Sequence, residues 1–160
     1  MGILSGKRGI IFGALDENSI AWKVALEAKK EGAIFTLSNA PVALRLGTIN
    51  ELATLCQSVV IPADATNTDD LDKLFDQSIA ELGGKIDFIL HSIGMSPNVR
   101  KEKPYTNLNY DFYLKSLDIS ALSLHKMLQV AYQKDAINEY GSVVALSYIA
   151  AQRAFPFYGD

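Results

Sequence analysis

Cysteine is nearly absent from this sequence, and long apolar runs and clusters of one charge are missing. Cys56 is the single cysteine among 160 residues, so it has no partner for an internal disulfide and we expect a cytoplasmic protein. No window approaches the roughly 18 uninterrupted apolar residues of a membrane span, so we expect no membrane insertion. A net charge of -3, with lysines and arginines scattered, leaves no basic face for nucleic acid. One cysteine and two widely spaced histidines offer no metal-binding set.

The remaining composition is that of one globular domain, with 49% hydrophobic and 21% charged residues. Apolar runs rich in β-branched and aromatic residues alternate with helix-like stretches. None of these runs alternates cleanly between polar and apolar residues, which indicates strands covered on both faces. The predicted strands are Gly9–Phe12, Ala33–Leu37, Ser58–Ile61, Ile86–Leu90 and Ser142–Leu146. We expect a single α/β domain over residues 1–160, with a doubly wound parallel sheet of Rossmann type in the order 3-2-1-4-5.

Apolar spacing and capping residues predict the helices. The first predicted helix is Ser19–Glu31, with Ile20, Val24 and Leu26 inside and Gly32 at its C-terminal cap. The other predicted helices are Val42–Leu55, Asp69–Leu82 and Leu108–Lys134. Gly94–Asn107 is predicted as a polar loop, longer than an ordinary α/β connection, and such loops at strand ends usually serve a ligand.

The turn after the first strand lies where a doubly wound sheet binds a dinucleotide pyrophosphate, against the free N–H groups of a helix N-terminus. Gly13 permits close backbone approach, and Asn18 or Ser19 is placed to cap the helix. The turn has one glycine where the GxGxxG pattern has three, so an ordinary capped strand-to-helix turn is an equal alternative. Asp16 and Glu17 would repel phosphate, and we expect both to face solvent.

The ends of the second and third strands bear on which nucleotide binds. Ser38 and Asn39 stand where an acid commonly holds the adenosine ribose. Arg45 is the nearest cation, placed either to approach a 2′-phosphate or to lie on the solvated face of its helix. These residues leave both NADH and NADPH open. Asp64, after the third strand, is placed either to accept a hydrogen bond from an adenine amino group or to cap the next helix.

The ends of the fourth and fifth strands complete a recognisable pattern. His91–Gly94 ends the fourth strand, Leu146–Tyr148 follows the fifth, and Tyr158 comes ten residues after Tyr148. The other members of the pattern are Gly13, Ser19, Ile20 and Asp64. Over the whole chain this pattern resembles the bacterial enoyl-acyl-carrier-protein reductases of the short-chain dehydrogenase superfamily.

The resemblance implies a role for each matching residue. It implies that the pyrophosphate is held by Gly13, Ser19 and Ile20 and that adenine is flanked by Asp64 and Ala65. It further implies that the cofactor lies above Ser92, Ile93 and Gly94. It implies a homotetramer acting on an enoyl group carried by acyl carrier protein, and it favours NADH. Ala40 stands where relatives often have glutamine, which leaves NADPH open.

Tyr158 is the predicted catalytic donor. Hydride delivery to the β-carbon of a trans-2-enoyl thioester leaves negative charge on the thioester oxygen, and a nearby phenol stabilises that enolate. Tyr148 is placed to line the acyl pocket and to assist. Without the resemblance, both tyrosines would be interpreted as packed aromatics. We expect His91 to support the floor under the cofactor and His125 to lie on the surface or at a helix interface.

Two alternatives remain beside the enoyl reductase. A 3-oxoacyl thioester reductase of the same superfamily carries a serine thirteen residues before its tyrosine, but Ala145 stands there in this chain. The other alternative is a non-catalytic dinucleotide-binding module, because the superfamily's active-site lysine would follow the tyrosine beyond Asp160. We therefore expect an N-terminal piece of a longer reductase, inactive by itself. We also expect Val143, Val144 and Leu146 to be uncovered at a sheet edge that invites self-association unless the remaining segments of the longer protein are present.

Overall fold

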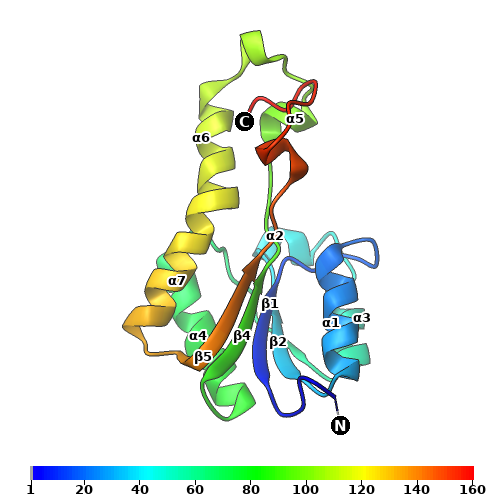
Figure 1. Cartoon of the computed structure of the whole chain (residues 1–160), viewed down its shortest axis with the longest axis vertical. Coiled ribbons are helices and arrows are strands. Elements are labelled where there is room, and N and C mark those ends of the chain that lie inside the picture. Colours follow the sequence, from blue (N-terminus) through cyan, green and yellow to red (C-terminus); the bar gives the residue numbers. More distant parts are fainter. Residues whose placement is uncertain (1) are drawn as a thin grey trace.

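The computed structural model describes residues 2–160, which form one five-stranded sheet in the order β3-β2-β1-β4-β5 (Figure 1). All four strand pairs are parallel. The strands are β1 (Arg8–Phe12), β2 (Ile34–Ser38), β3 (Val59–Val60), β4 (Ile86–His91) and β5 (Ile137–Ala145). The predicted fold class and strand order are confirmed. The strand bounds differ from the predicted ones by one residue at most, except that β5 begins well before its predicted start, at Ile137.

Helices cover both faces of the sheet (Figure 1). One face carries α1 (Ile20–Lys30) and α3 (Ile49–Cys56), and the other carries α4 (Thr68–Leu82) and α7 (Ser123–Gln133). Beyond the carboxyl ends of the strands lie α5 (Pro97–Arg100) and α6 (Tyr110–Leu117), with the C-terminal segment beside them. The remaining elements are α2 (Pro41–Leu44), 3-10 turns at Tyr105–Asn107 and Ile149–Ala151, and a π turn at Asp118–Leu122.

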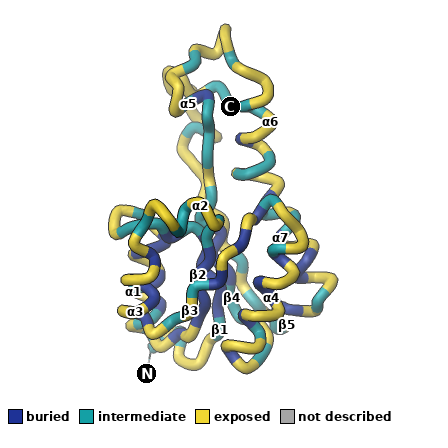
Figure 2. Tube along the Cα trace, turned by 180° about the vertical axis from the view of Figure 1, so that it is seen from behind, coloured by how far each residue is buried: buried dark blue, intermediate teal, exposed yellow. Residues whose placement is uncertain are grey.

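Two buried apolar clusters, one on each face of the sheet, hold these layers together (Figure 2). Ile10 and Phe12 of β1 enter the cluster under α4 and α7, while Ile11 enters the cluster under α1 and α3. Successive side chains of a strand point to opposite faces, so β1 is apolar at every position from Ile10 to Phe12 because both of its faces are buried there. None of the helices described in residues 2–160 is both long and apolar enough to cross a membrane.

The first helix contains Ile20, Val24 and Leu26, as predicted. Ile20 is 61% exposed and Val24 is 36% exposed, so these two do not form its buried face. The buried residues of α1 are Ala21, Trp22, Ala25 and Ala28. This spacing makes one helical face, and its alanines let the helix lie close to the sheet. The predicted end is confirmed, since Gly32 follows α1 with a φ of +88°.

The predicted helix Val42–Leu55 is two helices, α2 and α3, separated by a turn. In that turn the Thr48 N–H donates to the carbonyl oxygen of Leu15 at 2.9 Å. A Cβ on Gly47 would lie 2.3 Å from the same oxygen. The loop after β1 therefore packs against the turn between α2 and α3. In a continuous helix the Thr48 N–H would instead donate to a carbonyl oxygen within the helix.

The predicted helix Leu108–Lys134 is confirmed in outline, as α6, the π turn and α7 follow one another without a break. The predicted loop Gly94–Asn107 is only partly a loop, because it contains α5 and a 3-10 turn. Ser96 caps α5, its hydroxyl accepting from the Val99 N–H at 3.0 Å. This segment is therefore a structured layer above the sheet.

Strand β5 forms one edge of the sheet, as predicted. Val144 is 52% exposed and Leu146 is 38% exposed. The prediction for Val143 is wrong, because this side chain packs against the buried cluster under α7.

Candidate active site

The carboxyl ends of β1 and β4 meet at one edge of the sheet, where Gly13 lies against Ser92. A Cβ on Gly13 would lie 1.9 Å from the carbonyl oxygen of Ser92, and its φ of +89° is one that L side chains rarely adopt. The Gly13 N–H donates to the carbonyl oxygen of Ser38 at 3.0 Å, which ties the same turn to the end of β2. Position 13 therefore requires glycine, and the turn is held between β2 and β4.

The turn that follows Gly13 is closed by its own hydrogen bonds. The Ser19 hydroxyl accepts from the Leu15 N–H at 3.2 Å and donates to the carbonyl oxygen of Asp16 at 2.7 Å. Ser19 occupies the cap position of α1, but neither it nor the exposed Asn18 caps the helix with its side chain. The prediction of a side-chain cap is wrong. The N-terminus of α1, which carries the positive end of the helix dipole, is left without a side-chain acceptor.

The two acidic residues of this turn are placed differently. Glu17 is exposed as predicted, whereas Asp16 is half-buried and accepts from the Asn18 N–H at 2.9 Å. The prediction that Asp16 faces solvent is therefore only partly correct. Its carboxylate stabilises the turn after Gly13 through this hydrogen bond.

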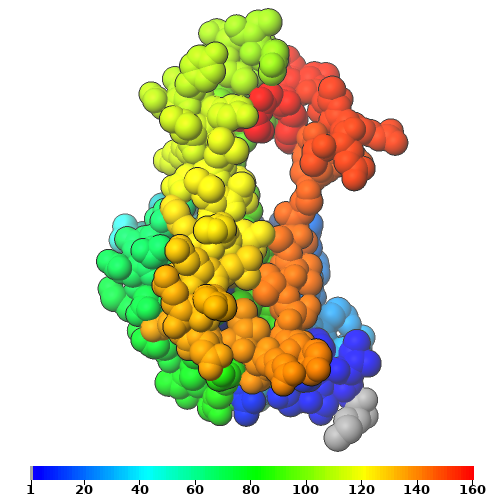
Figure 3. Space-filling model, turned by 60° about the vertical axis from the view of Figure 1, so that its left-hand side comes forward, coloured from blue at the N-terminus to red at the C-terminus, as the bar shows by residue number. Residues whose placement is uncertain are grey.

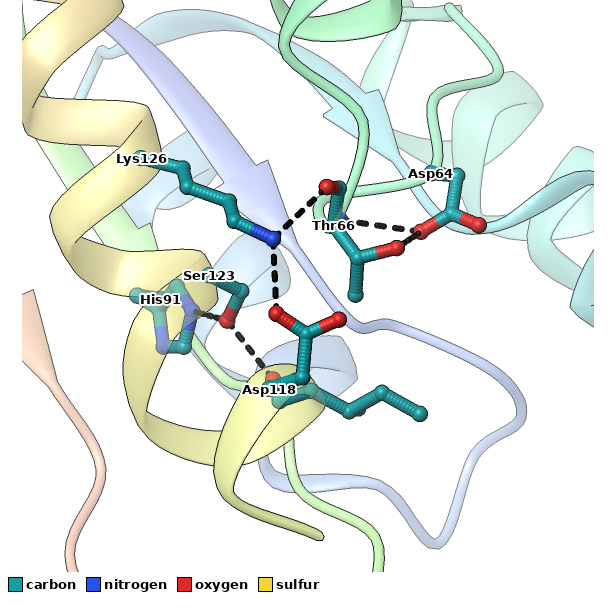
Figure 4. Close-up of polar contacts among 7 residues, drawn as sticks. Asp64, Thr66, His91, Asp118, Ser123 and Lys126 are labelled. Atoms are coloured by element: carbon teal, nitrogen blue, oxygen red, sulfur yellow. Dashed lines mark hydrogen bonds and ion pairs between the residues drawn. The ribbon is translucent and has the colours of Figure 1, made fainter. Parts of the chain in front are cut away.

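Asp64 shapes the turn after β3 and does not cap the next helix. One of its oxygens, Oδ1, accepts from the Thr66 N–H at 2.9 Å and from the Thr66 hydroxyl at 2.8 Å (Figure 4). Helix α4 is capped by Asn67, whose side chain accepts from the N–H groups of Asp69 and Asp70. The capping alternative for Asp64 is wrong. Asp64 remains exposed beside the buried Ala65, at the carboxyl edge of the sheet.

Lys126, on α7, connects the turn after β3 to the helices on the same face of the sheet. Its ammonium donates to the carbonyl oxygen of Thr66 at 2.9 Å and to Asp118 Oδ1 at 2.6 Å (Figure 4). The sequence analysis missed this contact. Thr66 and Lys126 are 60 positions apart, so no local spacing rule connects them.

His91 is buried at the end of β4 and hydrogen-bonds to Ser123 (Figure 4). The Ser123 hydroxyl donates its only proton to the carbonyl oxygen of Ile119 at 2.6 Å, so it accepts from His91 Nε2 at 2.8 Å. Burial lowers the pKa of His91, which keeps the ring neutral near pH 7. His125 is exposed, as expected. Across residues 2–160, no group of three or more histidine, cysteine or acidic side chains is arranged to hold a metal.

A pocket of about 850 Å³ opens above the end of β4, between α5 and α6 on one side and the chain after β5 on the other (Figure 3). The turn Ser92–Gly94 lines the pocket, as do Tyr148 and Tyr158. A Cβ on Gly94 would have no atom within 4 Å, so the pocket is open at this glycine.

The two predicted catalytic tyrosines lie together in this pocket. The rings of Tyr148 and Tyr158 stack with centroids 5.2 Å apart and an interplanar angle of 17°. Phe155 packs against both rings at 6.3 Å. Hydrogen bonding with Tyr158, together with the charge that Tyr158 carries when ionised, raises the pKa of Tyr148. The tyrosines are 54% and 43% exposed, so they are packed aromatics that also present their surfaces to the pocket.

The geometry brings all of the predicted cofactor residues to one edge of the sheet. Gly13, Ser19 and Ile20 lie after β1, Asp64 and Ala65 after β3, and Ser92–Gly94 after β4. In a doubly wound sheet this edge is where ligands bind. The sequence analysis missed a polar cluster around Asp160, which is built from residues far apart along the chain.

Comparison with known proteins connects this arrangement to a family. A family model described as enoyl-(acyl carrier protein) reductase matches residues 13–160. A curated relative, the NADH enoyl-acyl-carrier-protein reductase FabI of Rickettsia bellii, is 33% identical over 98% of this chain and 59% of its own length. The chain thus spans about three fifths of that relative.

Solved structures give the same result. FabI from Alistipes finegoldii is 59% identical with a TM-score of 0.94, over 98% of this chain and 60% of that one. A FabI–NADH complex from the same organism is 61% identical with a TM-score of 0.91, over 94% of this chain and 53% of that one. Because the family match covers the site and most of the sequence, the chain belongs to the enoyl-(acyl carrier protein) reductase family.

Proposed function

We propose that the protein carrying this chain is an NADH-dependent enoyl-acyl-carrier-protein reductase of fatty-acid biosynthesis. The observation that carries the proposal is the stacked pair of Tyr148 and Tyr158 in a pocket lined by the Ser92–Gly94 turn. That turn lies directly against Gly13, so a reducing cofactor bound along the sheet edge would end beside the tyrosines. The names of the relatives support the enoyl thioester as substrate.

The residues present fit a dinucleotide at two points. The uncapped N-terminus of α1 has N–H groups available for a pyrophosphate, next to the close approach that Gly13 permits. The open space at Gly94 leaves room for a flat ring over the end of β4. We propose that Gly13, Ser19, Ile20, Asp64, Ala65, Ser92, Ile93 and Gly94 hold the cofactor. In this proposal Ser19 acts through its backbone, because its hydroxyl is already engaged within the turn.

NADH is the proposed cofactor, and NADPH is the alternative. Arg45 is exposed at the end of α2, and its position favours the solvated-face interpretation. Relatives from Rickettsia bellii and Salmonella typhimurium are named for NADH, and one related structure is an NADH complex.

The chain's own contribution to the reaction is the phenol pair. When bound, NADH supplies the hydride that reduces the β-carbon. Tyr158 then donates a hydrogen bond to the thioester oxygen as negative charge develops there, which stabilises the enolate. Tyr148, with its raised pKa, keeps its proton and so remains a donor beside Tyr158. An oriented donor of this kind contributes about a hundredfold to ten-thousandfold in rate.

The direct test follows NADH oxidation by the full-length gene product with a crotonyl thioester of acyl carrier protein. We expect turnover with NADH, slower turnover with NADPH and none with a 3-oxoacyl thioester. NADH binding without any turnover would favour the non-catalytic module instead. Turnover of the 3-oxoacyl thioester would favour the ketone reductase.

We further propose a cytoplasmic homotetramer as the working form. The single cysteine is buried, and burial raises the pKa of its thiol, which suits a protein that stays reduced. Sedimentation of the full-length product tests the oligomeric state.

A further inference from the structure

The carboxylate of Asp160 lies in a cluster of neutral hydrogen-bond donors above the pocket. Its Oδ1 accepts from the Ser96 hydroxyl at 2.7 Å. Its Oδ2 accepts from Asn98 Nδ2 and lies within reach of the Ser116 hydroxyl, both at 2.9 Å. The Ser116 hydroxyl also lies 2.9 Å from the carbonyl oxygen of Phe112, so it shares one proton between two acceptors. Asp160 therefore contacts α5, α6 and the turn between β4 and α5 at once.

Asn98 is the centre of this cluster and is fully buried. Its Nδ2 donates to the carbonyl oxygen of Asn109 at 3.0 Å as well as to Asp160, and its Oδ1 accepts from the Asn109 N–H at 3.0 Å. Both ends of the amide are thus satisfied inside the protein. A buried amide left without one of these partners is costly, so the cluster holds together as a unit.

The charge of Asp160 is held by neutral donors alone. Within residues 2–160, no lysine, arginine or histidine forms an ion pair with it. Partial burial acts to raise the pKa of Asp160, but the hydrogen bonds from Ser96, Asn98 and Ser116 outweigh it, and the pKa lies below its ordinary value. The cluster is therefore built for the ionised carboxylate, and charge-assisted hydrogen bonds are the stronger kind.

The segment that carries Asp160 is the segment that carries Tyr158. Between them, Gly159 packs so closely on the loop before α6 that a Cβ there would lie 3.0 Å from Leu108 Cδ1. The Tyr158 N–H donates to the carbonyl oxygen of Phe155 at 3.2 Å, which makes the segment a turn. Figure 1 shows the C-terminus beside α5 and the outer end of α6. Tyr158 is half exposed and stacks on Tyr148, and this attachment adds a second constraint on its place at the pocket.

We propose that Asp160 is a positioning residue, which fastens the Tyr158 segment to α5 and α6 and so holds the Tyr158 phenol over the pocket. The effect on turnover rests on the proposed reductase function. The attachment of the Tyr158 segment rests on the hydrogen-bonded cluster alone. A misplacement of about 1 Å in a catalytic group is enough to cost roughly a hundredfold in rate, so a carboxylate that touches no substrate can still govern turnover.

The test uses Asp160→Asn in the full-length gene product, with Asp111→Asn as the matched control. Asp111 is an exposed carboxylate on α6 and has no part in the cluster. Asparagine keeps the size of the side chain but turns one acceptor into a donor, which then faces the hydroxyl or amide donors of the cluster. Ser116→Ala is the second variant, because alanine is well tolerated in a helix and removes a single hydroxyl from the cluster.

Two readouts separate the proposal from the function on which it depends. Hydrogen exchange of the backbone amides at residues 155–160 should rise about tenfold in Asp160→Asn, and less in Ser116→Ala. The kcat for a crotonyl thioester should fall about tenfold or more while the KM for NADH stays within about twofold. The control should change neither readout. Adding Ser116→Ala to Asp160→Asn should cost less than the sum of the two single effects.

The outcomes are distinct. Faster exchange with unchanged kcat would overturn the positioning role, and lower kcat with unchanged exchange would overturn the attachment. If the wild-type protein turns over no enoyl thioester, the proposed function fails, while the exchange measurement still decides the attachment. If Asp160→Asn does not fold, Ser116→Ala decides through the same two readouts.

Discussion

The carbonyl oxygen of Ser92 closes on Gly13 so tightly that any Cβ at position 13 would lie 1.9 Å from it. Gly13→Ala therefore forces the end of β1 away from β4, in addition to the cost of a side chain at positive φ. We expect a loss of about 2–4 kcal/mol in the free energy of unfolding, measured by urea denaturation, and weaker NADH binding measured by fluorescence.

Two other glycines provide the matched controls. Gly6 has a φ of +74° but no atom within 4 Å of its Cβ position, so Gly6→Ala should cost only about 1–2 kcal/mol. Gly94 has open space and no positive φ, so Gly94→Ala should leave stability within about 0.5 kcal/mol and still weaken NADH binding. Equal stability losses for Gly13→Ala and Gly6→Ala would show that the Ser92 approach has no energetic role.

The regular part of this fold follows from local pattern, and the exceptions arise from contacts between distant segments. Buried β strands, the glycine turn and the tyrosine spacing are each contained in a few neighbouring residues. The break between α2 and α3 comes from Leu15, whose carbonyl takes the hydrogen bond of Thr48. The position of Asp64 after β3 predicts a helix cap, but Asn67 is closer to the helix start and takes that role.

The same distinction between local pattern and distant contacts applies to the candidate site. Strand ends on one edge of a parallel sheet are predictable, so the sequence predicts that Gly13, Asp64 and Ser92 gather there. It does not predict the cluster at Asp160, because Asn98 lies 62 positions away and no periodicity relates the two. Buried polar networks of this kind depend on how loops fold back, which the sequence pattern does not encode locally.

Asp87 ties three segments together at the other end of the sheet. It accepts from the Arg8 N–H at 2.9 Å, from Lys7 Nζ at 3.2 Å and from Asn138 Nδ2 at 3.2 Å. Partial burial acts to raise the pKa of Asp87, but these hydrogen bonds outweigh it, and the pKa lies below its ordinary value. Its stabilisation is therefore full above the unfolded pKa of about 3.9 and is lost as the pH falls through the lower folded value.

We expect Asp87→Asn to lower the free energy of unfolding by about 1–2 kcal/mol at pH 7. The difference from wild type should shrink below about pH 4, since protonation removes the same charge from the wild type. Urea titrations at several pH values measure this difference in the free energy of unfolding. Asp135→Asn is the control, because the Lys85–Asp135 pair is exposed and should contribute less than about 1 kcal/mol. A pH-independent difference for Asp87→Asn would contradict the prediction.

Tyr158→Phe removes one hydroxyl and leaves the ring stacked on Tyr148. If this phenol stabilises the enolate, turnover of a crotonyl thioester should fall by about a hundredfold or more while NADH binding stays unchanged. Steady-state kinetics and NADH fluorescence measure the two effects. Tyr132→Phe, an 87% exposed tyrosine on α7, is the control and should change neither. Unchanged turnover in Tyr158→Phe would assign the donor role to Tyr148 or to water.

Strand β5 presents an uncovered apolar face at the edge of the sheet. Val143 packs under α7, so the next residue, Val144, points to the opposite face, which α1 and α3 do not cover at this strand. Val144 is 52% exposed there, and Leu146, on the same side, is 38% exposed. An apolar edge strand of this kind favours pairing with another chain.

We therefore expect residues 1–160 alone, without the remaining segments of the longer protein, to self-associate in a concentration-dependent way. Val144→Lys should weaken this association about tenfold or more, because a lysine on that face must stay hydrated. Sedimentation of both proteins over a range of concentrations measures it. Val42→Lys, at a 66% exposed valine on α2, is the matched control and should associate as the wild type does. Association that is equally strong in Val144→Lys would place the contact elsewhere, because a charge at the centre of an apolar contact cannot leave its strength unchanged.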